Sequence, residues 1–203
     1  MSSFDGIAPY YDLLSRLVFG KRIVEAQEYF LTEIKEGDRI LILGGGTGWI
    51  LKSIFKITGL VEVWYIDSSP KMIEKSATRN VAPPKVHFIC GTLDDIPSDM
   101  KFNVIITNFF LDMFSEASLL PLIDSISRKL QLDGRWLCTD FIKNEKWWQR
   151  VLLSIMYRFF KFTTDLKNDQ LPDWENQLRK HGMITLSEKT FLKGFMKATV
   201  QKK

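Results

Sequence analysis

Hydrophobic and polar positions in the first 141 residues alternate between two patterns. Short runs rich in Val and Ile, each bounded by turn residues, predict buried strands. These runs occupy residues 39–43, 61–66, 86–90, 104–107 and 135–141. Stretches with helical spacing lie between them, at residues 50–57, 70–79 and 116–130. This alternation of strands and helices predicts a parallel sheet with helices on both of its faces.

The last third of the chain follows another pattern. Residues 146–162 predict a long aromatic-rich helix, and residues 172–180 predict a shorter helix that ends before Gly182, a residue suited to a left-handed C-cap. Two β-like runs at residues 183–188 and 191–201 are separated by only two residues, which predicts an antiparallel hairpin. The expected fold is an α/β three-layer sandwich whose mostly parallel sheet ends in an antiparallel C-terminal hairpin.

Composition places the chain among ordinary globular proteins. Its 203 residues are 45% hydrophobic and 26% charged, which excludes a disordered chain, a collagen-like repeat and a disulfide scaffold. Cys90 and Cys138 lie inside apolar runs without a CxxC partner, so we expect two buried thiols and no metal site. No signal peptide and no apolar stretch of about 18 residues is visible, so the expected location is cytoplasmic.

Charge is distributed unevenly along the chain. Residues 141–203 contain 13 basic and 6 acidic side chains, whereas residues 1–140 contain 15 basic and 18 acidic ones. The basic excess predicts either an anionic or surface-bound partner for the C-terminal part or a solvated basic face, and both remain open. Nucleic acid is not expected as a partner, because the first 140 residues are net acidic and no RNA-binding signature occurs.

The clearest chemical signal is the glycine-rich turn Gly44-Gly45-Gly46-Thr47-Gly48, between the first predicted strand and a helix. Such a turn lets a ligand approach the backbone, and the start of the helix supplies free N–H groups. Asp67 ends the second predicted strand, where a carboxylate can accept hydrogen bonds from both ribose hydroxyls of an adenosine ligand. Trp49 stands where the NAD fingerprint needs its third glycine, which argues against a nicotinamide cofactor.

Taken together, these segments resemble the class I S-adenosylmethionine (SAM)-dependent methyltransferases over residues 4–141. Gly44-x-Gly46-x-Gly48 is similar to the first motif of the family. Later motifs follow in the family's order, as WYIDSSPKMI at residues 64–73, GTLDDIP at 91–97, FNVIITN at 102–108 and LQLDGR at 130–135. FDGIAPYYD at residues 4–12 is similar to the opening of the ubiquinone- and menaquinone-biosynthesis branch. The resemblance implies a seven-stranded sheet and SAM as the cofactor. A small, largely apolar methyl acceptor is expected if the apolar face of the predicted helix at residues 146–163 lines the acceptor pocket.

The resemblance also implies which residues bind the cofactor. They are Gly44, Gly46, Thr47, Gly48, Asp67, Ser68, Met72, Thr92, Leu93, Asp94 and Asn108. Asp67 would hold the ribose, and Leu93 would lie beside the adenine. Two positions depart from the family pattern, because Ile42 replaces an acidic residue near the methionine ammonium and Thr92 replaces an Asp near the adenine. A lost charged partner costs about 1–3 kcal/mol of binding.

Two alternatives to an active methyltransferase remain open, the first of them because of the missing acid at Ile42. One is a degenerate methyltransferase fold that acts as a non-catalytic binding or scaffold protein. The other is a nicotinamide-dependent dehydrogenase.

Candidates for a catalytic base are few. Methyl transfer depends mainly on positioning, with a base needed where the acceptor must lose a proton. Asp112 and Asp140 follow the fourth and fifth predicted strands, at the edge where α/β sheets bind ligands, and either could be that base. Surface solvation or helix capping is the alternative for each. Tyr11, with Tyr10 and Asp12, could close over the cofactor or pack as an N-terminal helix on the sheet; His87 and His181 are expected to be structural.

The predicted aromatic helix, at residues 146–163, has two different faces. Its apolar face consists of Trp148, Leu152, Ile155, Met156 and Phe159, and another face consists of Arg150, Ser154, Arg158 and Lys161. The apolar face could line an acceptor pocket, belong to the core, or lie on an anionic membrane as a peripheral contact.

We expect one domain over residues 1–203. It would contain N-terminal lid helices at 1–38, a cofactor-binding core at 39–141, a helical cap at 142–182 and a closing hairpin at 183–203. The sequence does not predict an oligomeric state.

Overall fold

A computed structural model describes residues 20–79, 85–143, 146–149, 151–154, 158 and 170–203. Seven strands form one sheet in the order β3-β2-β1-β4-β5-β7-β6. The strands are β1 (Arg39–Leu43), β2 (Glu62–Asp67), β3 (Val86–Cys90), β4 (Phe102–Asn108), β5 (Leu130–Phe141), β6 (Ile184–Phe191) and β7 (Met196–Lys202). Strands β1 to β5 pair in parallel, and β7 pairs antiparallel with both β5 and β6. The expected mostly parallel sheet with an antiparallel C-terminal hairpin is therefore confirmed.

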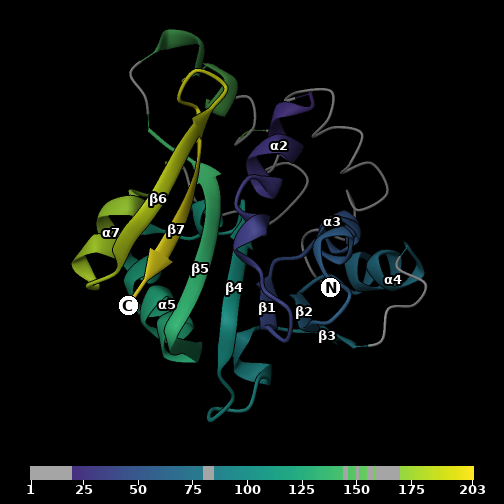
Figure 1. The fold of residues 1–203 in the computed structure, drawn as a ribbon. Helices are drawn as coiled ribbons and strands as arrows, with labels where there is room; N and C mark the ends of the chain where they lie inside the picture. The colour runs from purple at the N-terminus through teal and green to yellow at the C-terminus, as the bar shows by residue number, and fades with distance from the viewer. Residues whose placement is uncertain (1–19, 80–84, 144–145, 150, 155–157, 159–169) are drawn as a thin grey trace.

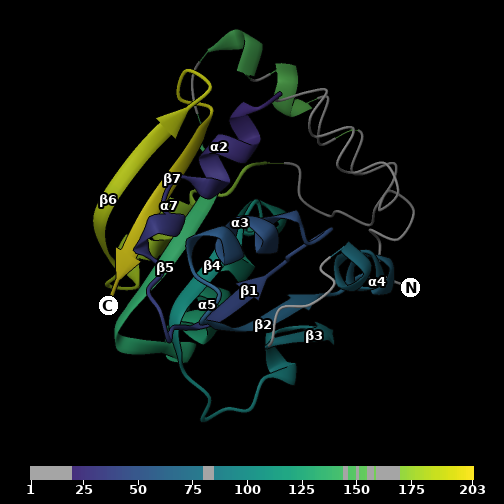
Figure 2. The same cartoon turned by 45° about the vertical axis from the view of Figure 1, so that its right-hand side comes forward.

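Helices cover the sheet from two sides (Figures 1 and 2). The described α-helices are α2 (Arg22–Glu28), α3 (Trp49–Ile57), α4 (Pro70–Arg79), α5 (Glu116–Lys129) and α7 (Trp174–Lys180). Three short 3₁₀ helices are η1 (Leu31–Glu33), η2 (Leu93–Asp95) and η3 (Leu111–Met113). Alternate side chains of β1 explain the layers, since Leu41 packs toward α5 and α7 while Ile42 packs toward α3. Strands buried on both faces need the continuous apolar runs seen in the sequence.

Two expectations are corrected. The hairpin turn lies at residues 192–195 and not at 189–190, because Leu192, Lys193 and Gly194 take the left-handed conformation that reverses the chain. Cys90 is exposed, since it ends the edge strand β3, whereas Cys138 is buried as expected. The position of an apolar residue in the sheet therefore decides whether it is covered.

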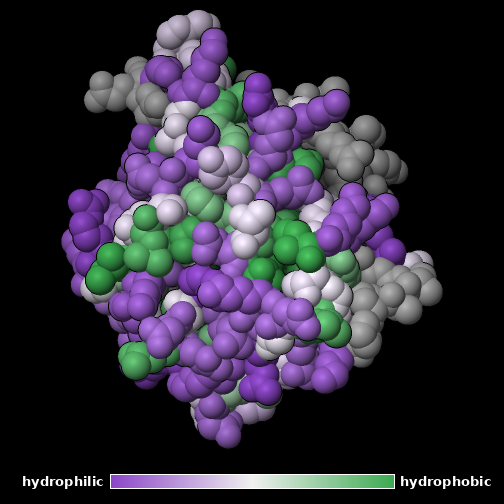
Figure 3. Space-filling model, viewed as in Figure 1, coloured by the Kyte–Doolittle hydropathy of each residue, from purple (hydrophilic) through white to green (hydrophobic). Residues whose placement is uncertain are grey.

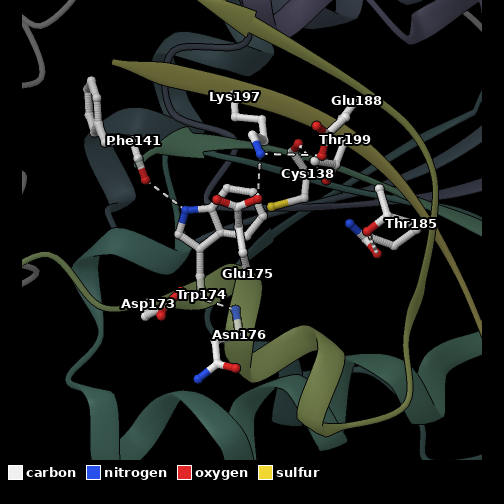
Figure 4. A network of polar contacts seen from close by, with 11 residues as sticks. Cys138, Phe141, Asp173, Trp174, Glu175, Asn176, Thr185, Glu188, Lys197 and Thr199 are labelled. Atoms are coloured by element: carbon white, nitrogen blue, oxygen red, sulfur yellow. Dashed lines mark hydrogen bonds and ion pairs between the residues drawn. The ribbon is translucent and has the colours of Figure 1, made fainter. Parts of the chain in front are cut away.

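Polar contacts hold helix α7 to β5 and to the C-terminal hairpin (Figure 4). The buried indole of Trp174 donates a hydrogen bond from Nε1 to the carbonyl of Phe141 at 2.7 Å. The ammonium of Lys197 on β7 lies 2.7 Å from Glu175 and 3.3 Å from Glu188. Burial lowers the pKa of Lys197, but the bonds to these two carboxylates outweigh it and leave that pKa raised.

Figure 3 shows a mainly hydrophilic face with hydrophobic side chains grouped in small areas. Within the described part of the chain, no helix is both long and apolar enough to cross a membrane.

Candidate ligand-binding site

The turn at residues 44–48 connects β1 to α3 in a conformation that requires glycine. Gly44, Gly46 and Gly48 have φ angles of +63°, +66° and +79°. A Cβ at Gly44 would lie 2.6 Å from the Phe110 ring, whereas at Gly46 no described residue lies within 4 Å. The turn therefore packs tightly against its neighbours at one glycine and leaves the backbone at Gly46 open to a ligand.

Asp67 at the end of β2 fixes this turn. Its Oδ2 accepts a hydrogen bond from the N–H of Gly46 at 2.8 Å, and its Oδ1 accepts one from the N–H of Ser69 at 2.8 Å. The hydroxyl of Tyr65 donates to the carbonyl of Gly46 at 3.2 Å. A carboxylate offers about four acceptor positions, two of which these bonds occupy. The arrangement is compatible with an additional ligand hydroxyl at Asp67.

A pocket lies on the other flank of the turn, over the ends of β1 and β4. It is lined by Ile23, Val24, Gln27, Ile42, Leu43, Gly44, Gly45, Gly46, Thr47, Trp49, Ile50, Asn108 and Phe109. None of these described residues is charged. The site thus has two chemically different sides, with the Asp67 carboxylate on the β2 side and an apolar pocket with a few amide and hydroxyl groups on the β4 side.

Several expected cofactor-binding residues meet in this pocket. Gly44, Gly46, Thr47 and Asn108 line it directly. The hydroxyl of Thr47 accepts a hydrogen bond from Arg79 at the end of α4, at 3.2 Å. Gly48 adjoins these residues as the N-cap of α3.

The other expected cofactor-binding residues lie toward β3. Ser68 is exposed after β2, and Met72 is buried in α4. Thr92 caps η2, because its hydroxyl accepts from the N–H of Asp94 at 3.3 Å. Leu93 packs against the core from this same turn. The strand order places this group beyond Asp67, on the side opposite the pocket.

Asp140 is enclosed where β4 and β5 end. It is fully buried within β5, and its Oδ2 accepts the N–H groups of Phe110, Leu111 and Asp112 at 3.2, 2.9 and 3.2 Å. Its Oδ1 accepts the N–H of Phe141 at 2.8 Å. Capping of η3 is thus the structural role of Asp140, and surface solvation is wrong for it because β5 carries it inside the sheet.

Asp112 belongs to η3 and lies beside Asp140 of β5. The residue is half-buried, but its Oδ1 is enclosed and has no hydrogen-bond partner among the described residues. Burial raises the pKa of Asp112 to about 7. Burial also raises the pKa of Asp140, with a further contribution from Asp112, against the lowering effect of the N–H groups. Since these donors favour the charged form of Asp140, we place the proton that the pair retains near neutral pH on Asp112.

The last residues singled out in the sequence are Tyr11 and the two histidines. Tyr11, with Tyr10 and Asp12, lies outside the described residues. His87 lies 3.1 Å from Glu62 and stacks on Trp64, and His181 bonds to Ser127 at 2.8 Å. Both histidines have the structural surroundings expected of them.

The apolar face of the aromatic helix is described only in part. The Trp148 ring lies 6.0 Å from that of Phe195, and Leu152 packs against the same cluster. That cluster also contains Ile23 and Phe109, which line the pocket. Ile155, Met156 and Phe159, like Arg150 and Lys161, lie outside the described residues.

Several residues that line the pocket carry no signal in the sequence. Ile23, Val24 and Gln27 come from α2, a short helix without a motif, and only a general lid was expected there. Phe109 has a φ of +51°, which no local signal marks in a non-glycine residue. Its N–H donates to the carbonyl of Thr139 at 2.7 Å, so pairing between β4 and β5 holds this conformation.

Comparisons with known proteins agree with this geometry. Residues 40–134 match the family model of a methyltransferase domain. The chain is 32% identical over 150 residues to the demethylmenaquinone methyltransferase of Thermotoga maritima, a match that covers 70% of this chain and 61% of that protein.

Solved structures share the fold. One is a chain in the complex between the Haloferax volcanii Trm112 methyltransferase activator and a putative methyltransferase, with a TM-score of 0.74, 14% identity and coverage of 100% and 98% of the two chains. Another is the plantazolicin methyltransferase BpumL in complex with SAH, with a TM-score of 0.66, 17% identity and coverage of 97% and 88%. The present chain spans about three fifths of the length of the Thermotoga relative.

Proposed function

We propose that this chain is a class I SAM-dependent methyltransferase, that it binds SAM and that it transfers the methyl group to a small, largely apolar acceptor. The observation that carries this proposal is the open backbone at Gly46, held by Asp67 on one side and bordered by an apolar pocket on the other. When bound, SAM supplies a methyl group already activated on a sulfonium. The protein then has to provide position and, for some acceptors, a proton acceptor.

The residues present fit this cofactor. Asp67 would hold the ribose hydroxyls, and the glycine turn would let the ligand pass close to the backbone. The adenine would lie toward Thr92, Leu93 and Asp94, and the methionine part toward Asn108. The strand order supports this direction, since η2 follows β3 while the pocket lies over β1 and β4.

An apolar acceptor is favoured by the cluster next to the pocket. Phe109, Phe141, Phe195 and Trp148 form a chain of ring contacts, with centroids 4.7 to 6.0 Å apart. Since Phe109 lines the pocket, an acceptor that reaches the methyl group would contact this ring, which the buried Phe141 and Phe195 support from behind. Above the raised pKa of Asp112, about 7, its carboxylate is the better placed of the two to take a proton, because the oxygens of Asp140 already accept four N–H groups.

Calorimetry with S-adenosylhomocysteine (SAH), the product form of the cofactor, tests this proposal. We expect saturable binding by the wild-type chain and a loss of about tenfold or more in affinity for Asp67→Ala. Leu132→Ala, at an exposed position on β5, is the control and should bind like wild-type. No heat at millimolar SAH would reject the proposed function.

A non-catalytic binding protein is the second candidate. It is favoured by Ile42, an apolar residue in the pocket where the family carries an acid. Binding of SAH without methyl transfer to any extracted apolar acceptor would favour this alternative over the enzyme.

We also propose a peripheral contact with anionic membranes through the exposed face of the aromatic helix. Trp147 is 73% exposed and Val151 is 50% exposed, and the exposed Ser154 and Arg158 follow on the same helical face. Co-sedimentation with phosphatidylglycerol vesicles tests this contact. The double variant Trp147→Ser, Val151→Ser should no longer bind the vesicles, whereas the control Leu132→Ser should bind like wild-type. Equal sedimentation of the wild-type chain, the double variant and the control would reject the membrane contact.

A further inference from the structure

The pocket beside the glycine turn has to bind the charged end of a ligand, although none of its described lining residues is charged. If the cofactor proposed above binds with its ribose at Asp67, its amino-acid end extends over the turn into this pocket. That end carries an ammonium and a carboxylate, and both need hydrogen-bond partners when they leave water. Among the lining residues, Ile42, only 2% exposed, places a hydrocarbon at the penultimate position of β1.

The polar groups that remain in the pocket are few. Within the turn, the N–H of Gly46 is bonded to Asp67, and the N–H of Gly45 is bonded to the carbonyl of Ile66 at 3.1 Å. The hydroxyl of Thr47 accepts from Arg79. The pocket also has two side-chain amides that can face the charged end of a ligand, Asn108 from β4 and Gln27 from α2.

Gln27 is distinguished by where its helix places it. It follows Ile23 by four residues and Val24 by three, so the three share the face of α2 that lines the pocket. Glu28, the next residue of α2, accepts a hydrogen bond from Ser53 on α3. Among the described residues, no hydrogen-bond partner is found for the Gln27 amide. Gln27 is half-buried, so its amide stays accessible to a ligand in the pocket that this residue lines.

We infer that the side-chain amide of Gln27 binds the amino-acid end of the cofactor, in place of the carboxylate that this pocket lacks at Ile42. An amide suits a zwitterion because its Oε1 accepts from an ammonium and its Nε2 donates to a carboxylate. The inference rests on the proposed SAM site and assigns a binding residue on a helix outside every motif of the sequence. It also explains how the site can do without an acid at the end of β1.

Two ligands that differ only at this end test the inference. SAH carries the amino-acid group, whereas 5′-methylthioadenosine has the same adenosine and thioether without it. Both are titrated calorimetrically into wild-type protein, Gln27→Met, Gln27→Ala and the control Gln131→Ala. Met preserves the length of the side chain and removes only its polar atoms, and Gln131 is an exposed amide on β5 bonded to Asn103.

The expected result is selective. Gln27→Met and Gln27→Ala should weaken SAH about tenfold and leave 5′-methylthioadenosine within about twofold of wild-type, while Gln131→Ala changes neither. Equal weakening of both ligands, or no weakening of SAH, would overturn the role of Gln27 while leaving the proposed SAM site intact. Wild-type protein that binds neither ligand would overturn the proposed function itself and the inference with it.

Discussion

Replacing Asp112 with Asn should stabilise the protein increasingly as the pH rises. Burial raises the pKa of Asp112 from 3.8 to about 7, so the folded chain keeps a proton that the unfolded chain releases between these values. The stability provided by the protonated carboxyl is complete below about pH 4 and is lost as the pH approaches 7. At about 1.4 kcal/mol per pKa unit, the loss is about 4 kcal/mol. Asn resembles the protonated acid and cannot ionise, so the variant avoids this loss.

Urea unfolding at about pH 5 and about pH 8 measures the effect. Between these values the free energy of unfolding of Asp112→Asn should rise by about 3 kcal/mol relative to wild-type. The exposed Asp99→Asn is the control, and its difference from wild-type should not follow this trend. Titratable groups facing Asp112 are Asp140 and the buried thiol of Cys138, whose own pKa is raised well above 9.0 by burial.

Asp140→Asn distinguishes the two carboxyls. An Asn at this position presents an NH₂ group to N–H groups that now face oxygen, so it should destabilise the protein by about 1–3 kcal/mol at both pH values. The reasoning is refuted if the difference between Asp112→Asn and wild-type stays constant within about 0.5 kcal/mol from pH 5 to pH 8.

Three further predictions concern the glycine turn, the cofactor site and the contact between α7 and β5. Gly45→Ala would place a Cβ in steric overlap with Cζ of Tyr65 and should lower the free energy of unfolding by about 1–3 kcal/mol. Gly46→Ala should lower it by about 1 kcal/mol and chiefly weaken the binding of SAH. The same loss of stability in urea unfolding and the same loss of SAH affinity in calorimetry for both variants would contradict this. Asp67→Asn should weaken the binding of SAH more than the binding of a 5′-methylthioadenosine analogue without the two ribose hydroxyls. Calorimetry that shows the same loss of affinity for both ligands would argue against a ribose contact. Trp174→Phe removes the buried hydrogen bond to the carbonyl of Phe141 and should cost about 1–3 kcal/mol in urea unfolding, while the exposed Trp147→Phe should change stability by less than about 0.5 kcal/mol.

The local elements of the fold could be predicted from the sequence. Strands β1 and β3 and helix α4 have the bounds that their residues predict, because apolar runs and turn residues act within a few positions of one another. The glycine turn was equally predictable, since φ angles near +60° exclude most other residues at Gly44 and Gly46. Expectations for Tyr11 and for most of the apolar face at residues 146–163 remain predictions.

Contacts between distant segments could not be predicted in this way. Cys90 and Cys138 lie in similar apolar runs, yet only the strand order leaves one at an edge and encloses the other. Asp112 and Asp140 are 28 residues apart, and the pairing of β4 with β5 brings them together away from water. Gln27 reaches the pocket because α2 packs across the ends of strands that follow it in the chain. Periodicity tells which side chains share a face of one element, but the solvation of a carboxyl or an amide depends on what packs against that face, and only the tertiary structure determines that.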